Sequence, residues 1–230
     1  MKRLLVLPLL LVGSQLSLAA DSALKTDISK ESYSIGYDFG KNISKRLADV
    51  EMKTFINGFE DAFQGTASKL TQDEMMAAMQ SYRQKMMVKQ QAERAGKSEE
   101  NKAASVKFLT ENKKQKGVMT LASGMQYTVL ADGTGKTPTA SDTVTVHYRG
   151  TLANGEEFDS SYRRKEPATF PVSGVIKGWT EALQLMKEGG KWQLFIPPEL
   201  AYGEQGAGAS IGPNEVLIFE VELIEVKSSS

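Results

Sequence analysis

The sequence contains few side chains that could carry out covalent chemistry. Among its 230 residues there is one histidine, His147, and no cysteine. A single histidine excludes a histidine metal cluster and argues against a Ser-His-Asp triad, and the lack of cysteine excludes a thiol nucleophile and a disulfide. Gly135-Lys136-Thr137 resembles the end of a phosphate-binding loop, but Leu130 stands where that motif requires glycine. We therefore expect no metal and no cofactor.

Aromatic residues from separate segments form the stronger candidate set. Each could instead be an ordinary core residue, and for Phe170 both interpretations stay open. Tyr202 lies in a glycine-rich loop, which is a poor place for core packing, and Asp159 could either serve the same site or cap a turn. The set predicts a dry, aromatic-lined cavity with few polar groups, the usual construction of a small-ligand site. Its aromatic members are Tyr148, Phe158, Phe170, Trp179, Tyr202 and Phe219.

Hydrophobic periodicity in the C-terminal half predicts the elements that would hold this set. Apolar and polar residues alternate around Val146 and again around Val221, which indicates β-strands. Asn154-Gly155 predicts a tight hairpin turn with a positive φ at both positions. Apolar residues at helical spacing from Trp179 predict a short helix ending at Gly189-Gly190, where a left-handed cap is favourable. One helix lying against an antiparallel sheet is an α+β fold.

The N-terminal third, after the first 20 residues, is expected to be helical because it lacks proline. Thr71 and Glu74 have the spacing of a capping box. No proline interrupts residues 71–115, so one long helix is expected, with its continuity at Gly96 left open. Residues 89–116 are mostly polar, with almost nothing apolar until Val106, Phe108 and Leu109, so 89–117 should form a solvated linker part of that helix. Apolar helical stripes precede this part at Phe55, Ile56, Phe59 and Phe63, then at Met75, Met76, Met79, Tyr82, Met86 and Met87.

Five separated motifs in residues 118–227 resemble the FKBP family, the peptidyl-prolyl isomerases that rapamycin-type macrolides inhibit. They occur in the order and at the spacing of that family. The motifs are Val146-His-Tyr148-Arg-Gly150, Glu157-Phe-Asp-Ser-Ser161, Val175-Ile-Lys-Gly-Trp179, Pro197-Pro-Glu-Leu-Ala-Tyr202-Gly-Glu204 and Ile211-Gly-Pro-Asn-Glu-Val-Leu-Ile-Phe219.

This resemblance implies a role for each candidate residue. Trp179 would form the floor of the pocket, and Val175 and Ile176 would form its lip, with the Ile176 amide donating to a ligand carbonyl. Arg164 matches a position that often pairs with the aspartate, Asp159. Ala168 departs from the family, since many relatives carry an aromatic wall residue there. The implied catalytic residues are Tyr148, Phe158, Asp159, Tyr202 and Phe219, and the implied substrate-binding residues are Phe170, Val175, Ile176, Trp179, Ile211 and Arg164.

The resemblance implies a peptidyl-prolyl cis-trans isomerase that acts by desolvation and orientation and binds proline-containing polypeptides. The Met-rich helical region, the long helix and the C-terminal domain together resemble the Mip/FkpA type of secreted bacterial isomerase. In that type the N-terminal domains form a homodimer. A holdase chaperone, or a surface-exposed virulence or binding factor with incidental isomerase activity, remains the alternative.

The first residues have the layout of a signal peptide. Lys2 and Arg3 precede an apolar run that is too short to span a bilayer, and small residues follow at Ala19-Ala20. Removing Lys2 and Arg3 lowers the 28 basic residues to 26 against 28 acidic ones, so the net charge is about −2 and nucleic acid is not an expected partner. We expect residues 1–20 to be a signal peptide, 21–88 a dimerisation domain, 89–117 a linker and 118–230 an isomerase domain. The expected location is the periplasm of a Gram-negative bacterium, with outer-membrane association left open.

Overall fold

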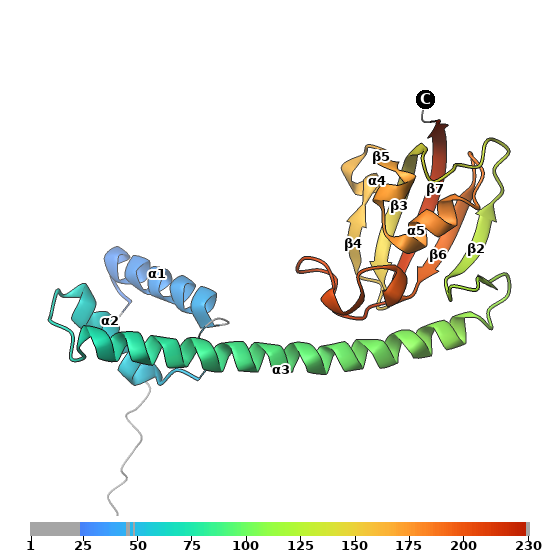
Figure 1. Ribbon diagram of the computed structural model, residues 1–230. Coiled ribbons are helices and arrows are strands. Elements are labelled where there is room, and N and C mark those ends of the chain that lie inside the picture. The colour runs from blue at the N-terminus through green and yellow to red at the C-terminus, as the bar shows by residue number, and fades with distance from the viewer. Residues whose placement is uncertain (1–23, 45–46, 48, 229–230) are drawn as a thin grey trace, which may run out of the picture. The chain divides into compact units, whose positions relative to one another are not determined.

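The computed structural model describes residues 24–44, 47 and 49–228, so the expected signal peptide lies outside the described residues. The chain divides into two compact units between Met86 and Met87. Figure 1 shows that the first unit is helical and that the second contains the β-sheet. Each helix in the described ranges is too short or too polar to cross a lipid bilayer.

The first unit contains α1 (Asp27–Ser44), α2 (Met52–Phe63) and the beginning of α3 (Gln72–Asn112). The capping box predicted for α3 is present. The Glu74 amide donates to Thr71 Oγ1 at 3.3 Å, and the Thr71 amide donates to Glu74 Oε2 at 2.8 Å. This exchange satisfies two amides that the helix itself cannot pair, and it explains why α3 begins directly after Thr71.

The predicted apolar stripes lie on these helices but are not buried within the unit. Phe39 of α1 and Phe59 of α2 are in contact, with ring centroids 6.3 Å apart. Nevertheless Phe59 is 52% exposed and Phe63 is 83% exposed, and neither α1 nor α2 contains a buried residue. The first unit therefore presents a large apolar surface.

The long helix α3 is continuous through Gly96. Its second half belongs to the second compact unit, and the expectation of a wholly solvated linker does not hold along one face of it. Phe108 packs against Phe195 with ring centroids 6.0 Å apart, and the buried Gln126 side chain donates to the Leu109 carbonyl at 2.8 Å. The end of α3 therefore packs directly against the domain that follows it.

The strands described in the second unit form one antiparallel sheet in the order β1-β2-β6-β7-β3-β4, with β5 paired to β3. This confirms the α+β class. The central strands β3 and β7 pair over ten registered positions, including Gly150 opposite Phe219. The strands are β1 (Met119–Thr120), β2 (Gln126–Ala131), β3 (Thr143–Leu152), β4 (Glu157–Ser160), β5 (Ala168–Pro171), β6 (Lys191–Ile196) and β7 (Leu217–Lys227).

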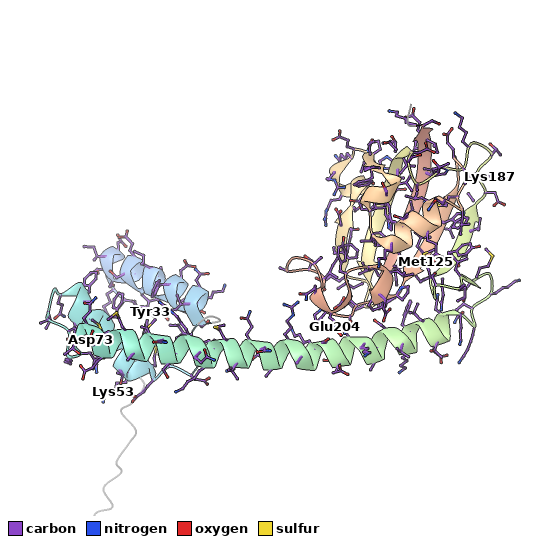
Figure 2. All side chains as sticks on the ribbon, in the orientation of Figure 1. Tyr33, Lys53, Asp73, Met125, Lys187 and Glu204 are labelled. Atoms are coloured by element: carbon purple, nitrogen blue, oxygen red, sulfur yellow. The ribbon has the colours of Figure 1, made fainter. Side chains whose placement is uncertain are left out.

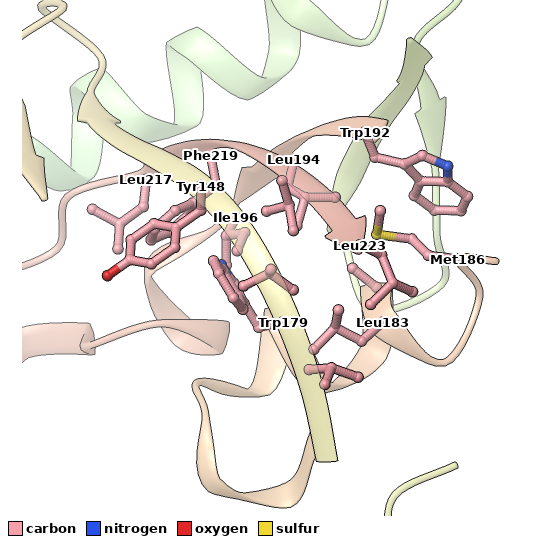
Figure 3. Close-up of a cluster of buried hydrophobic side chains, with 14 of the residues drawn as sticks. Tyr148, Trp179, Leu183, Met186, Trp192, Leu194, Ile196, Leu217, Phe219 and Leu223 are labelled. Carbon is pink, nitrogen blue, oxygen red and sulfur yellow. The ribbon is translucent and has the colours of Figure 1, made fainter. Parts of the chain in front are cut away.

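Helix α5 (Lys177–Leu183) covers one face of this sheet, as predicted (Figure 1). Trp179 and Leu183 on the helix pack in one cluster with the alternating apolar side chains of β3 and β7. Figure 3 shows this cluster, with Tyr148, Trp179 and Phe219 toward one end and Trp192 and Met186 toward the other. The remaining short elements are α4 (Ser161–Arg164), η1 (Val172–Gly174), η2 (Pro198–Leu200) and η3 (Gly203–Gln205).

Two local predictions were wrong. Helix α5 ends at Leu183 rather than at Gly189-Gly190, although Gly189 does have the predicted positive φ, at 85°. The Gly189 amide donates to the Leu223 carbonyl at 2.8 Å, so this residue binds β7 instead of capping α5. In the β3–β4 hairpin Gly155 has a positive φ of 87°, but Asn154 does not. Asn154 Oδ1 instead accepts from the Glu156 amide at 2.9 Å, so the side chain closes a longer turn.

Candidate active site

A cavity of about 480 Å³ opens in the second unit beside α5. Its walls come from strands β3, β4, β5 and β7, from the segment leading into α5, and from the loop between β6 and β7. It is lined by Tyr148, Phe158, Asp159, Phe170, Gly174, Val175, Ile176, Trp179, Tyr202 and Phe219.

The aromatic rings are arranged around the Trp179 indole. Tyr148 and Phe219 meet it edge to face, with centroid distances of 5.3 and 5.2 Å, and Phe170 does so at 6.0 Å. Phe158 extends the wall through a T-shaped contact with Phe219 at 5.4 Å. Edge-to-face contacts are the favoured geometry for aromatic pairs, so these rings support one another. The buried Trp179 Nε1 has no hydrogen-bond partner among the described residues.

Gly150 makes this arrangement of rings possible. A Cβ atom at this position would lie 2.6 Å from the Phe158 ring and 2.8 Å from the Phe219 ring. Any other residue would therefore displace both walls. The sequence analysis did not identify Gly150 as a site residue, although an isolated glycine inside a predicted strand signals a close approach of this kind.

One polar cluster interrupts the aromatic wall. The Tyr148 hydroxyl donates to Asp159 Oδ2, and Arg164 binds both partners, through an ion pair to Asp159 Oδ1 and a 2.8 Å bond to the Tyr148 oxygen. The Ser160 amide donates to Asp159 Oδ1 at 2.8 Å. The guanidinium also lies 5.5 Å from the Tyr148 ring centroid. The cluster therefore fixes the orientation of both the carboxylate and the tyrosine ring.

This cluster shifts two pKa values in opposite directions. Burial, and then the hydrogen bond to Asp159, raise the pKa of Tyr148. For Asp159, burial acts to raise the pKa, but the hydrogen bonds from Tyr148 and Arg164 outweigh it and lower the pKa. At neutral pH the site therefore holds a neutral phenol and an ionised carboxylate that is neutralised by Arg164.

His147 lies outside the cavity, as its position next to Tyr148 on the strand predicts. Its ring stacks on Tyr162 at 4.7 Å, and its Nδ1 is 2.9 Å from Ser161 Oγ. The same Ser161 hydroxyl accepts from the Tyr148 amide at 2.8 Å. Ser161, the first residue of α4, therefore anchors the backbone of Tyr148 and also contacts His147.

Two potential hydrogen-bond donors lie at the rim. Tyr202 is 40% exposed, and its hydroxyl makes no hydrogen bond with another described residue. The Ile176 carbonyl accepts from the Trp179 amide at 2.9 Å, which begins α5, while the Ile176 N–H has no acceptor within the described chain. Both groups can therefore bind a carbonyl oxygen of a ligand.

The structure brings most of the predicted site residues together, with two exceptions. Arg164 is not part of the cavity wall but holds Asp159 and Tyr148. Ile211 lies in the hydrophobic core rather than in the wall, since its backbone pairs with Ala207 and its side chain is only 9% exposed. Gly174, which the sequence analysis did not select, does line the cavity.

Comparisons with known proteins find matches to one family along most of the chain. A family model described as "FKBP-type peptidyl-prolyl cis-trans isomerase" matches residues 134–224. A second, described as "Domain amino terminal to FKBP-type peptidyl-prolyl isomerase", matches residues 28–129. The two matches together cover nearly all of helices α1 to α3 and of the sheet.

Individual relatives match over nearly their whole length. The peptidyl-prolyl cis-trans isomerase Mip of Coxiella burnetii is 48% identical over 99% of this chain and 99% of its own length. The outer membrane protein MIP of Legionella longbeachae is 46% identical over 91% of this chain and 90% of its own. The crystal structure of FkpA from Escherichia coli has a TM-score of 0.74 at 39% identity, over 90% of this chain and 99% of the FkpA chain.

Proposed function

This chain belongs to the family of FKBP-type peptidyl-prolyl cis-trans isomerases, and from that premise we propose that it rotates X–Pro bonds in the cavity around Trp179. The observation that carries this assignment is the enclosure of the Trp179 indole by three edge-on aromatic rings beside one fixed carboxylate. A proline ring is apolar and compact, and it matches a cavity of this size and composition.

The aromatic wall would lower the barrier by desolvation. Rotation of a peptide bond meets a barrier of about 18–20 kcal/mol because twisting breaks the amide resonance. The planar amide carries more charge on its oxygen than the twisted one does. An apolar cavity therefore destabilises the planar ground state more than the twisted transition state, and this difference accelerates the reaction.

The rim would hold the backbone on either side of the rotating bond. Tyr202 Oη and the Ile176 N–H are both free to donate to substrate carbonyls. Fixing these carbonyls leaves the X–Pro bond as the freest rotation, and orientation of this kind contributes to rate without covalent chemistry. The chain thus needs no nucleophile for the reaction.

The polar cluster would keep the cavity in one shape during turnover. Arg164 and Tyr148 occupy both oxygens of Asp159, so the carboxylate is held against the aromatic wall. Asp159 therefore acts with Arg164 and Tyr148 as one fixed polar group in the cavity wall.

An assay of X–Pro isomerisation in a short peptide, with and without rapamycin, tests this proposal. We expect Tyr202→Phe and Asp159→Asn each to lower kcat/KM about tenfold, the equivalent of one lost hydrogen bond of about 1.4 kcal/mol. Glu157→Gln is the matched control, because Glu157 lies on the same strand but pairs with Arg149 and Arg163 outside the cavity. Wild-type kinetics in both cavity variants, with rapamycin binding unchanged, would place the active site elsewhere.

We further propose that the first unit forms a homodimer. Its helices leave Phe59, Phe63 and Met76 more than half exposed, and apolar surface of this extent is unusual on a monomer. The match of residues 28–129 to the domain found before FKBP-type isomerases supports this assignment. A second copy would cover these side chains and provide the core that the unit lacks.

The signal-peptide pattern supports secretion into a bacterial periplasm, and the name of the Legionella relative supports an association with the outer membrane. A holdase chaperone remains the second candidate function, because the exposed methionines of α3 could bind unfolded chains. Suppression of aggregation by the Asp159→Asn protein would separate the two functions, because a chaperone keeps full suppression when isomerase activity is lowered.

A further inference from the structure

The second half of α3 contacts the loop between β6 and β7 through one line of polar side chains. Arg94, Ser98, Asn101 and Ser105 follow one another at spacings of four, three and four residues, which places them on one face of the helix. Figure 2 shows the loop at Glu204 next to this part of α3. We call this line the polar stripe of α3.

The N-terminal member of the stripe, Arg94, binds the middle of the loop. The Arg94 guanidinium donates to the Gln205 carbonyl at 2.8 Å and to the Glu204 carbonyl at 3.4 Å. These carbonyls belong to the short η3 turn that directly follows Tyr202. Arg94 thus restrains the loop close to the rim of the cavity.

The other members bind the end of the loop. Ser105 Oγ donates to the Asn214 carbonyl at 2.9 Å and accepts from the Val216 amide at 2.8 Å. Asn101 donates to the Pro213 carbonyl at 2.8 Å, and Ser98 Oγ accepts from the Asn214 side chain at 2.8 Å. Ser105 and Asn214 are only 4% and 7% exposed, so few of these bonds can be replaced by water.

Asn214 connects the end of the loop to the segment that follows Tyr202. It has a positive φ of 54°, which is unusual for a residue other than glycine, and its amide donates to the Gly203 carbonyl at 2.8 Å. Gly203 is the residue after Tyr202. A continuous set of bonds therefore runs from Ser98 and Ser105 through Asn214 and Gly203 to the backbone of Tyr202.

We propose that Ser98, Asn101 and Ser105 are positioning residues for the isomerase reaction, which act by holding the β6–β7 loop so that Tyr202 stands at the rim of the cavity. This inference rests on the proposed function, in which Tyr202 binds the substrate. These three residues do not touch the substrate. They bind residues 213–216 at the end of the β6–β7 loop, and that loop carries Tyr202.

The test is a double-mutant cycle in the full-length protein, read as kcat/KM on a short X–Pro peptide. Ser105→Ala should lower kcat/KM about tenfold, because displacing a rim group by a fraction of an ångström weakens its contact with the substrate. In a Tyr202→Ala background the same change should have little further effect. In a Phe158→Leu background it should keep its full effect, because Phe158 lies on β4 and takes part in none of the hydrogen bonds between the polar stripe and the loop.

Three controls separate positioning from a general loss of structure. Ser105→Thr, which keeps the hydroxyl, should restore activity. Lys102→Ala, an exposed change on the same helix, should leave kcat/KM unchanged. Asn214→Gly keeps the freedom to adopt a positive φ but removes the bond to Ser98, so it should also lower kcat/KM. If Ser105→Ala does not fold, the half-buried Asn101→Ala replaces it in the cycle.

Additive losses in both cycles, or full activity in Ser105→Ala and Asn214→Gly, would overturn this inference. So would full activity in Tyr202→Ala, because the loop would then carry no group that the reaction uses. In these cases the proposed function would still be judged separately, by the loss of activity in Asp159→Asn.

Discussion

The shape of the cavity depends on residues that do no chemistry, and Gly150 is the clearest of them. Its missing side chain lets the rings of Phe158 and Phe219 approach the same strand position, where Phe158 contacts Phe219 and Phe219 contacts Trp179. Arg164 has a comparable role on the polar side, where it holds Asp159 and Tyr148 together. The aromatic and polar walls are therefore both fixed before any substrate binds.

Gly150→Ala should damage the fold and the activity together. The added methyl group would lie within 2.8 Å of two rings, and overpacking of this kind destabilises a core by about 1–3 kcal/mol. Denaturant unfolding and kcat/KM on a peptide measure the two effects. Gly96→Ala is the control, since a Cβ at Gly96 meets nothing within 4 Å; it should stabilise α3 by up to about 1 kcal/mol. Normal stability of Gly150→Ala would refute this explanation of the wall.

The lowered pKa of Asp159 predicts how its contribution to the free energy of unfolding changes with pH. The hydrogen bonds from Tyr148 and Arg164 lower the folded-state pKa below the ordinary value of 3.8. The ionised form is thus favoured by folding, and its contribution is complete above pH 3.8 and is lost as the pH falls through the lower folded value. Thermal unfolding between pH 6 and pH 2.5 should show the wild type losing its advantage over Asp159→Asn only at the acid end. A constant difference across this range would contradict the prediction.

At the scale of elements, α3 contributes different surfaces along its length. Its first turns present methionines, and its second half presents the polar stripe followed by Phe108 and Leu109. The sequence analysis expected residues 118–230 to form the isomerase domain by themselves. The contacts of α3 instead favour a domain that begins at Met87, where the second compact unit starts.

A fragment of residues 87–230 should therefore be more stable than one of residues 118–230. Without the helix, the buried Gln126 side chain and the Val216 amide lose their partners, at about 1–3 kcal/mol for each unsatisfied group. Denaturant unfolding of both fragments measures the difference, and light scattering should find both monomeric. Equal stability of the two fragments would show that α3 is only a linker.

At the scale of the whole molecule, activity and assembly should be separable, because they belong to different compact units. The apolar stripes of α1, α2 and early α3 lie in the first unit, and the cavity lies in the second. A change that disrupts the first unit need not reach the rings around Trp179.

Phe59→Glu or Met79→Glu should dissociate the proposed dimer or unfold its helices, because each places a charge on an apolar stripe. Isomerisation of a short peptide should survive, while activity on a large unfolded protein should fall, since such a client gains from two linked sites. Light scattering and the two assays measure these effects. Gln90→Glu, an exposed change in the polar half of α3, is the control. A monomeric wild type, or an equal loss on both substrates, would refute this division of roles.

Periodicity and local spacing predicted the helices, the capping box at Thr71 and the alternating strands, and the resemblance to the FKBP family implied most of the residues that line the cavity. Caps and hydrophobic periodicities depend on residues that are close together in the sequence, so the sequence is sufficient to identify them. The inward-facing residues of β7 are an example, since Leu217, Phe219, Val221 and Leu223 are all buried as their alternation predicted.

Only the tertiary structure shows which polar groups form hydrogen bonds with residues far away in the sequence. Ser105 and Asn214 are 109 residues apart. The sequence of the polar stripe of α3 does not indicate that the backbone of the β6–β7 loop is its partner. Ile211 is a second example, since its motif implied a substrate-binding residue, and only the folded chain shows that it pairs with Ala207 and belongs to the core cluster. Hydrophobic periodicity reports which face of an element avoids water. The partner of a polar face depends on how the chain brings distant elements together, and only the folded structure contains that information.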